Sequence, residues 1–380
     1  MKIIKSIFIG LILLLLTGLL ITGCNDSESQ QKGLKIGLIV PLTGELATYG
    51  QSAKRGVELA IEEVNSNELL NDGRQIELFL EDSKGETKTA INALQKFMNI
   101  ENVKLFIGDI SSTVTLGMIP VVEQNEAFLF SSCAATPELT NISNYFARNW
   151  PSNSQEANSA AEYAFNQMNI EEAVIVYVNN DWGIGLQESF EKHFTNLGGE
   201  ILDNVIYDYE QRDFRTLVVQ LNEINTPLIY LAGNQREMGN FIRQFRETGI
   251  ETPVIANTSF LEPDALTLAG EYANGVIVPT PAYDPQDTSS TIQAKFYNKF
   301  KEQYPDIEPA LTDANSYDAI MLIVEAYNEV GNNPLEISEY IRNLKNYSGA
   351  AGKVSFTDGD VEVQTVFKKV VDGKPQVIKN

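Results

Sequence analysis

The side chains that most often carry catalysis or bind metals are scarce in this chain. Its 380 residues include two Cys, Cys24 and Cys133, and a single His, His193. His193 falls in a helical run and is predicted at the edge of its apolar face, which favours a structural role. If Cys24 is modified, as argued next, the one remaining thiol and one imidazole are too few for an ordinary zinc site or a Ser-His-Asp or Cys-His enzyme. We therefore expect no catalytic residue, no metal and no cofactor.

Cys24 ends a segment that is unlike the rest of the chain. A short positive start is followed by an almost wholly apolar run, residues 7–21, and then by Thr22-Gly23-Cys24. This pattern is typical of an export signal, too short and wrongly flanked for a membrane span. Its ending resembles the bacterial lipobox, in which the Cys is lipidated and becomes the mature N-terminus. We expect a signal peptide at 1–23, a lipid anchor on Cys24 and a polar tether at 24–33. The alternative is a plain secretory peptide with an incidental Cys.

The following sequence repeats one pattern, a short apolar strand, a polar turn and an amphipathic helix. Strands are predicted at 35–40, 75–80, 105–107, 128–130, 173–178, 201–207, 228–231, 254–256 and 276–278. Apolar residues recur between them at helical spacing, as in Ala53, Val57, Ala60 and Val64. The alternation predicts an α/β fold with two doubly wound lobes, divided near Trp150. In such sheets ligands bind where loops leave the carboxyl ends of strands, here in the cleft between the lobes.

Charge limits the partners. The chain has 28 Lys and Arg against 51 Asp and Glu, a formal net charge of −23 at pH 7. Because phosphate binding needs a basic surface, nucleic acid is excluded as a partner.

Short motifs occur in a fixed order along the chain after residue 33. They are Lys35-Ile36-Gly37-Leu38-Ile39-Val40-Pro41-Leu42-Thr43-Gly44, Tyr49-Gly50, Ser111-Ser112-Thr113, Thr136-Pro137-Glu138-Leu139-Thr140, Asp181-Trp182-Gly183, Glu237-Met238-Gly239 and Ser316-Tyr317-Asp318-Ala319. Each is weak alone. Their order and spacing make the chain resemble the leucine-binding (branched-chain amino acid) substrate-binding lipoproteins of ABC transporters, in the type I periplasmic binding protein family. The resemblance implies two Rossmann-like lobes joined by three hinge crossings, with a ligand cleft between them.

The resemblance also implies a division into lobes. We place the crossings near 149–151, 279–281 and 349–352, where Pro and Gly suit hinges. The expected lobes are 34–149 plus 281–349 (lobe 1) and 150–280 plus 350–380 (lobe 2).

In this family the first lobe binds the carboxylate of an amino acid through hydroxyls and backbone N–H groups of two loops. The matching positions are Ser111, Ser112 and Thr113 in the first loop and Cys133, Ala134, Ala135 and Thr136 in the second. Hydroxyls and helix-end amides suit a carboxylate, because hydrogen bonds to charged groups are the stronger ones. The alternative for Ser112 or Thr113 is to cap the following helix, and both roles can coexist.

Three positions depart from the family pattern. The second loop has Ala135 where Thr is usual, with Thr136 one position later. The acid that pairs the ligand ammonium falls at Thr258, and an expected aromatic residue is Asn234. Because a buried ammonium without its anion is strongly penalised, leucine binding is in doubt. An amide, a hydroxylated acid or a more polar amino acid would suit Asn234 and Thr258.

Three more side chains bear on the ligand. Tyr49 and Trp182, the latter in place of the more usual Tyr, can stack on whatever enters, although Tyr49 is equally well read as a rim residue packed on a loop. Asp313 either supplies a substitute acid or caps a helix.

The sequence thus predicts an exported solute-binding lipoprotein, a monomer with a small-molecule ligand and an ABC permease as partner. It is anchored in the cell envelope, on the periplasmic side or the outer face of the cytoplasmic membrane, and it is not an enzyme. A sensory receptor that passes a ligand-dependent conformation to a kinase or chemoreceptor has the same fold and stays open as the second hypothesis.

Overall fold

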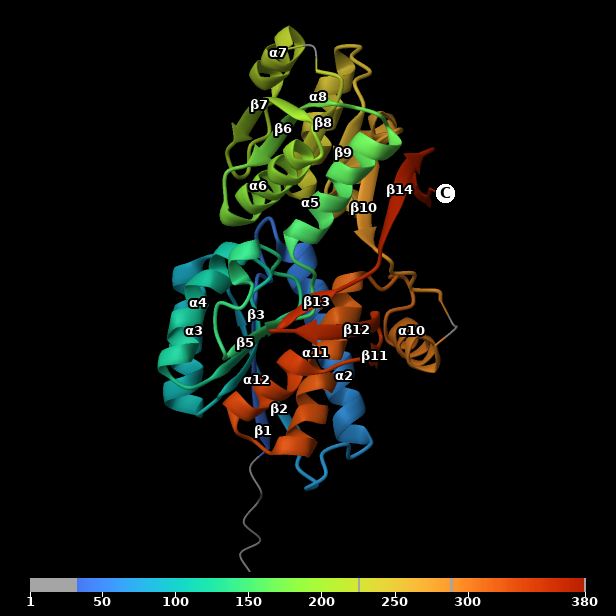
Figure 1. Cartoon of the computed structure of the whole chain (residues 1–380). Helices are drawn as coiled ribbons and strands as arrows, with labels where there is room; N and C mark the ends of the chain where they lie inside the picture. Colours follow the sequence, from blue (N-terminus) through green and yellow to red (C-terminus); the bar gives the residue numbers. More distant parts are fainter. Residues whose placement is uncertain (1–32, 225, 288–289, 379–380) are drawn as a thin grey trace, which may run out of the picture.

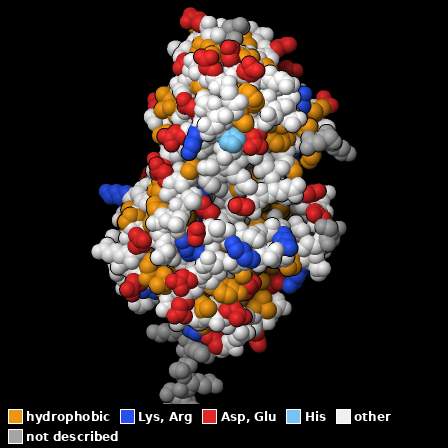
Figure 2. Space-filling view, in the orientation of Figure 1, with side chains coloured by type: hydrophobic (Ala, Val, Ile, Leu, Met, Phe, Trp, Pro, Cys, Tyr) orange, Lys and Arg blue, Asp and Glu red, His pale blue; other side chains and the backbone are white. Residues whose placement is uncertain are grey.

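The computed structural model describes residues 33–224, 226–287 and 290–378, which form two lobes stacked end to end (Figure 1). The predicted signal peptide, Cys24 and all but the last residue of the predicted tether lie outside the described residues. Among the described residues, no helix is both long enough and apolar enough to cross a membrane. Acidic side chains are spread over both lobes on the face seen in Figure 2, in keeping with the net charge.

The first lobe is built on a parallel sheet with strand order β2-β1-β3-β4-β5. Its strands are β1 (Leu34–Val40), β2 (Ile76–Asp82), β3 (Leu105–Gly108), β4 (Phe128–Ser131) and β5 (Phe146–Arg148). Its helices are α2 (Ala47–Ser66), α3 (Thr87–Lys96), α4 (Ser112–Gln124), α10 (Thr291–Gln303), α11 (Leu311–Val330) and α12 (Pro334–Asn343). Side chains alternate along β1, so that Ile36 and Leu38 pack against α2 and α11, whereas Ile39 packs against α3 and α4. Helices therefore cover both faces of the sheet.

The second lobe has a larger sheet with strand order β15-β14-β10-β9-β8-β6-β7. Its strands are β6 (Glu172–Val178), β7 (Glu200–Tyr207), β8 (Ile229–Ala232), β9 (Val254–Ala256), β10 (Ile277–Pro281), β14 (Thr365–Val371) and β15 (Lys374–Val377). Its helices are α5 (Asn153–Glu162), α6 (Asp181–Asn196), α7 (Arg215–Ile224), α8 (Gln235–Glu247) and α9 (Pro263–Ala269). Helices α7, α8 and α9 pack on one face, and α5 and α6 on the other. The predicted α/β fold with two doubly wound lobes is confirmed.

One boundary was predicted wrongly. Residues 350–362 were assigned to the second lobe, but β11 (Tyr347–Gly349), β12 (Gly352–Thr357) and β13 (Asp360–Glu362) form a small sheet on the first lobe. Phe356 and Val361 are buried in the first-lobe core. The Asp318 carboxylate on α11 accepts the amides of Ala350 and Ala351 at 2.7 and 2.9 Å. These contacts hold the segment to the first lobe.

The third crossing therefore lies later than predicted. It falls between β13 and β14, at Val363 and Gln364, because β14 pairs antiparallel with β10 of the second sheet. Arg148 anchors the segment just before it, with Nε 2.6 Å from Asp360 Oδ1. Gln155 of α5 contacts the crossing itself through its Nε2, which donates to the Val363 carbonyl at 2.7 Å. The other two crossings lie between β5 and α5 and after β10.

Candidate ligand-binding site

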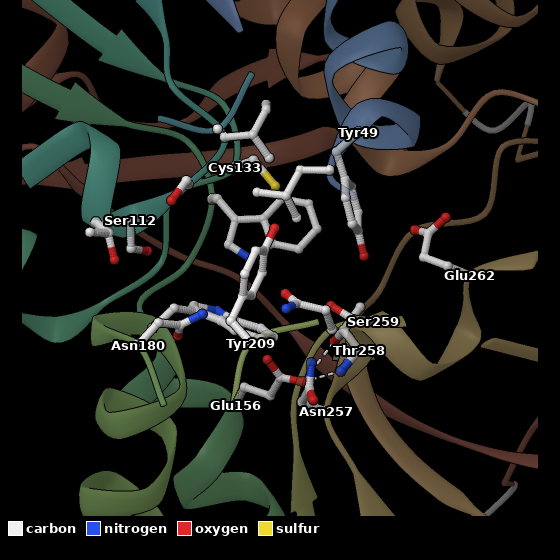
Figure 3. A pocket seen from close by; sticks show the side chains of 18 residues that line it. Tyr49, Ser112, Cys133, Glu156, Asn180, Tyr209, Asn257, Thr258, Ser259 and Glu262 are labelled. Carbon is white, nitrogen blue, oxygen red and sulfur yellow. Dashed lines mark hydrogen bonds between the residues drawn. The ribbon is translucent and has the colours of Figure 1, made fainter. Parts of the chain in front are cut away.

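A cavity of about 290 Å³ lies between the lobes, at the carboxyl ends of strands from both sheets (Figure 3). The first lobe lines it with Leu46, Tyr49, Gly85, Ile110, Ser111, Ser112, Thr113 and Cys133. The crossing contributes Trp150, and the second lobe contributes Glu156, Asn180, Trp182, Tyr209, Asn234, Asn257, Thr258, Ser259 and Glu262. This is the position at which doubly wound folds bind small molecules.

Most of the residues predicted from the sequence come together here. Tyr49, Ser111, Ser112, Thr113, Cys133, Trp182, Asn234 and Thr258 line the cavity, whereas Ala134, Ala135 and Thr136 lie outside it. His193 also lies elsewhere, on α6, where its Nε2 is 2.9 Å from a Glu162 oxygen.

Part of the first-lobe wall is the beginning of α4. Ser111 is the N-cap, and its Oγ accepts a hydrogen bond from the Val114 N–H at 3.4 Å. The N–H groups of the first helical turn, including those of Ser112 and Thr113, have no acceptor within the helix and carry partial positive charge. Ser111, Ser112 and Thr113 thus offer hydroxyls and amides to a negative group, and capping and ligand binding are compatible.

The second predicted loop, Cys133 to Thr136, forms hydrogen bonds within the protein. The N–H groups of Ala135 and Thr136 both donate to Ser112 Oγ at 3.1 Å. Thr136 Oγ1 donates across the cleft to the Asp181 carbonyl at 3.3 Å. The prediction that Ala134, Ala135 and Thr136 face a ligand does not match this geometry, because their polar groups bond within the protein. The displaced hydroxyl of Thr136 joins the two lobes instead.

Cys133 lines the cavity but is not activated. Burial raises the pKa of its thiol to about 12, although a hydrogen bond with Thr312 opposes the shift. The thiol stays protonated at neutral pH, and a protonated thiol is a poor nucleophile.

Glu156 is the acid that the sequence did not reveal. It lies in the first turn of α5, directly after the first crossing. Its Oε1 contacts both the backbone N–H of Thr258 and the Thr258 hydroxyl, the latter at 2.8 Å, while Oε2 has no donor among the described residues. Burial raises the pKa of Glu156 to about 7, against the opposing effect of the Thr258 hydrogen bonds. Position 258 is a Thr and not an acid, but the carboxylate of Glu156, which lies far away in the sequence, is hydrogen-bonded to Thr258.

A second carboxylate, Glu262, lines the cavity from the start of α9. Burial raises its pKa to about 7, and the nearby Asp313 and Asp264 carboxylates add to the shift. Among the hydrogen bonds and ion pairs of the described residues, none involves the Glu262 side chain. Glu262 is therefore an unpaired, partly buried acid at a cavity wall.

Asp313, the substitute acid considered from the sequence, has another role. Its Oδ2 accepts the N–H of Ala310 at 2.9 Å, at the start of α11, and its Oδ1 is 2.9 Å from Arg55 Nε. Asp313 is not among the cavity residues. The helix-cap interpretation is the correct one.

Aromatic and amide side chains complete the walls. Gly50 lets the first turn of α2 approach β1, since a Cβ there would lie 1.8 Å from the Pro41 carbonyl oxygen, and this contact places the neighbouring Tyr49 at the cleft. Tyr49 is buried, lines the cavity and forms a side-chain hydrogen bond with Ser259 of the other lobe. Asn257 is fully buried, and its Nδ2 has no acceptor among the described residues. Tyr209 and Trp150, which were not predicted, add further ring surface.

The chemistry of the lining residues is that of a binding site. None of the residues that line the cavity is Lys, Arg or His, so the two carboxylates face no protein cation there. In the part of the chain that the structure describes, no group of three or more His, Cys, Asp or Glu side chains is placed to hold a metal ion.

Comparisons with known proteins show which family and which solved structures the chain is similar to. Residues 33–373 match the family model described as periplasmic binding protein. The Leu/Ile/Val-binding protein homolog 1 of Brucella abortus is 26% identical over 352 residues, 90% of this chain and 93% of that protein. Among solved structures, a leucine binding protein from Thermotoga maritima is 27% identical with a TM-score of 0.85, covering 91% of this chain and 98% of that chain. An ABC transporter substrate-binding protein from Desulfitobacterium hafniense in complex with Leu is 25% identical with a TM-score of 0.76, covering 91% and 100%.

Proposed function

The chain belongs to the periplasmic binding protein family, and from that premise we propose that it captures a free α-amino acid between its lobes for delivery to an ABC permease. The names of its relatives support the amino acid class, because they include Leu/Ile/Val-binding proteins and a substrate-binding protein in complex with Leu.

The observation that carries the proposal is the opposite polarity of the two cavity walls. The first-lobe wall presents the hydroxyls and helix-end amides of Ser111, Ser112 and Thr113, which suit a carboxylate. The second-lobe wall presents Glu156, whose Oε2 has no donor among the described residues. A zwitterionic amino acid can satisfy both walls at once, with its carboxylate on α4 and its ammonium on Glu156. Thr258 then acts as a positioning residue, because it holds the Glu156 carboxylate.

Capture proceeds by hinge closure about the three crossings. Contacts that join the lobes at the edge of the cleft favour this mechanism: Glu45 of the first lobe lies 3.4 Å from Arg212 and 3.5 Å from Arg236 of the second. The Thr136 to Asp181 hydrogen bond is a further cross-cleft contact. A ligand that bridges Ser112 and Glu156 would add to these contacts and shift the population toward the closed form.

The remaining predictions are consistent with this role. The protein is exported, held to the membrane by a lipid on Cys24, and acts as a monomer that releases its ligand unchanged. It is a transport receptor and not an enzyme.

The experiment is thermal unfolding of the purified full-length chain against a panel of amino acids, amides and carboxylic acids. A ligand of the native state adds about 2.7 kcal/mol to the free energy of unfolding at a hundredfold excess over Kd. We expect a shift with at least one α-amino acid, one-to-one stoichiometry and full recovery of the ligand. A shift only with acids that lack an amino group, or consumption of the ligand, would contradict the proposal.

A further inference from the structure

One acid is left over when an α-amino acid is placed in the cavity. The carboxylate of the ligand meets Ser111, Ser112 and Thr113, and its ammonium meets Glu156. Glu262 then still lines the cavity, without a hydrogen bond or an ion pair among the described residues. Asp313, its acidic neighbour, is ion-paired with Arg55 and offers Glu262 no positive charge.

The layout of the cavity shows where Glu262 would meet a ligand. Figure 3 shows Ser112 at one end of the cavity and Glu262 at the other, with Glu156 below the space between them. A ligand whose carboxylate and ammonium occupy Ser112 and Glu156 therefore extends its side chain toward Glu262. The Tyr49 side chain lies along this path, close enough that the Glu262 carboxylate helps to raise the pKa of its phenol.

Resting on the function proposed above, we propose that the ligand is an α-amino acid with a positively charged group at the far end of its side chain, and that Glu262 is the counter-ion of that group. The lining residues include two acids and no base, so a ligand with two positive groups gives each of the two acids one cation, while its own carboxylate meets the uncharged hydroxyls and amides at the start of α4.

Electrostatics favours this ligand over a neutral one. Closing the cleft over an apolar side chain would bury the ionised Glu262 without a partner, and an unpaired buried charge is strongly destabilising. A side-chain ammonium or guanidinium replaces the lost hydration of the carboxylate, and the neighbouring ring of Tyr49 adds attraction for a cation. Burial already holds the pKa of Glu262 at about 7 in the free protein, which is the response of a carboxyl group that lacks a cation.

The test compares lysine with norleucine, which has a similar side chain without the amino group, by calorimetric titration of the full-length chain at pH 8. We expect lysine to bind at least about tenfold more tightly, since one charge-assisted contact is worth that factor or more. Glu262→Gln should abolish the preference by weakening lysine binding more than norleucine binding. Asp264→Asn, which removes a charge from the same helix outside the cavity, should keep it.

The other possible results distinguish a failure of this inference from a failure of the proposed function. Norleucine or leucine binding as tightly as lysine would overturn this inference and leave the proposed function standing. An unchanged lysine to norleucine ratio in Glu262→Gln would overturn the assignment of Glu262. Binding of no amino acid at all would overturn both the inference and the proposed function. The wild-type ratio is informative even if the Glu262→Gln variant fails to fold.

Discussion

The two walls of the cleft differ in how they are built. The part of the first-lobe wall proposed to meet the ligand carboxylate is one continuous segment, Ser111 to Thr113 at the start of α4, and it carries no formal charge. The second-lobe wall is assembled from separate segments: Glu156 comes from α5, Asn234 precedes α8, and Asn257 to Glu262 follow β9. It carries both carboxylates. In the proposed binding mode, Ser111 to Thr113 meet the carboxylate common to all amino acids, and the assembled second-lobe wall distinguishes one ligand from another.

The walls also differ in how their polar groups are satisfied. Ser112 Oγ already accepts two buried amides, so the first wall is rigid before any ligand arrives. On the second wall, Glu156 Oε2, Glu262 and Asn257 Nδ2 have no partners among the described residues. The polar groups of the first wall are therefore satisfied by the fold itself, whereas the proposed ligand would supply the partners that the second wall lacks.

Removal of Glu156 from the second wall should have the largest effect on binding. Glu156→Gln should weaken amino acid binding by about 30-fold or more, because a buried ammonium that loses its anion costs about 2 to 5 kcal/mol. Calorimetric titration measures the change. Glu162→Gln, on the exposed part of the same helix, is the matched control and should bind as wild type. A loss of less than about threefold in Glu156→Gln would exclude Glu156 as the ammonium partner.

The first wall should respond differently to two neighbouring substitutions. Ser112→Ala leaves the amides of Ala135 and Thr136 without their acceptor, so the free energy of unfolding should fall by about 1 to 3 kcal/mol. Thr113→Ala removes an exposed hydroxyl and should weaken binding by about tenfold with an unchanged melting temperature. Denaturant titration and calorimetry together separate the effects. Equal stability of both variants would contradict a first wall whose polar groups the fold itself satisfies.

Binding should depend on pH through the second wall. The ammonium of the ligand pairs with ionised Glu156, whose pKa is about 7 in the free protein. Binding lowers that pKa, so Glu156 releases about half a proton when the ligand binds at pH 7, and affinity falls as pH drops. One such group gives about tenfold weaker binding at pH 6 than at pH 8.

The groups that can titrate at the cavity are Glu156, Glu262, Cys133, Tyr49 and Tyr209, and only the two acids do so between pH 6 and 8. Titration in buffers of different ionisation enthalpy counts the released protons. Affinity that is constant from pH 6 to 8 would show that neither acid meets a cation.

Without ligand, the same acids should make the protein less stable at higher pH. A carboxyl group whose pKa is raised by folding from 4.5 to about 7 stabilises the folded state in its protonated form, and this contribution is lost as pH rises through that window. Glu262→Gln should therefore raise the melting temperature by about 2 °C at pH 8 and leave it unchanged at pH 4. A lower melting temperature at pH 8 would mean that Glu262 has a stabilising partner.

The smallest effect is expected at the edge of the cleft. Glu45→Gln removes the contacts with Arg212 and Arg236, which are exposed by 73% and 46%. Such pairs contribute about 0 to 1 kcal/mol, so affinity should fall by no more than about fivefold, and high salt should reduce the difference. Calorimetric titration of the wild type and Glu45→Gln with ligand at two salt concentrations measures this difference. A larger, salt-independent loss would indicate that Glu45 contacts the ligand.

Sequence reasoning succeeded where the relevant residues are adjacent in the chain. Alternating apolar periodicity predicted the strands and both lobes, and the Ser111 to Thr113 run led directly to the first wall. The sequence also showed that the acid expected by resemblance is absent at Thr258. Its replacement was not found, because Glu156 lies 102 residues earlier and no local pattern connects the two positions. Its one signal was an acid in the first turn of a helix that follows a crossing.

The wrong boundary has a similar cause. Strands β12 and β13 are short and partly exposed, so their composition does not indicate which lobe they join. The decisive contacts are long-range: Asp318 with the amides of Ala350 and Ala351, and Arg148 with Asp360. The Ser316 to Ala319 motif, noted only as a family feature, supplies one of these contacts and is structural.

The most direct test of the account is a paired titration of the wild-type chain. The amino acid that stabilises the protein most is titrated at pH 8 beside its 2-hydroxy analogue, which keeps the carboxylate and the side chain but lacks the ammonium. If Glu156 pairs with the ligand ammonium, the analogue should bind at least about 30-fold more weakly, because Glu156 then has no cation to pair with. Equal binding of the two ligands would show that the second wall does not recognise an ammonium, and would contradict the proposed amino acid receptor.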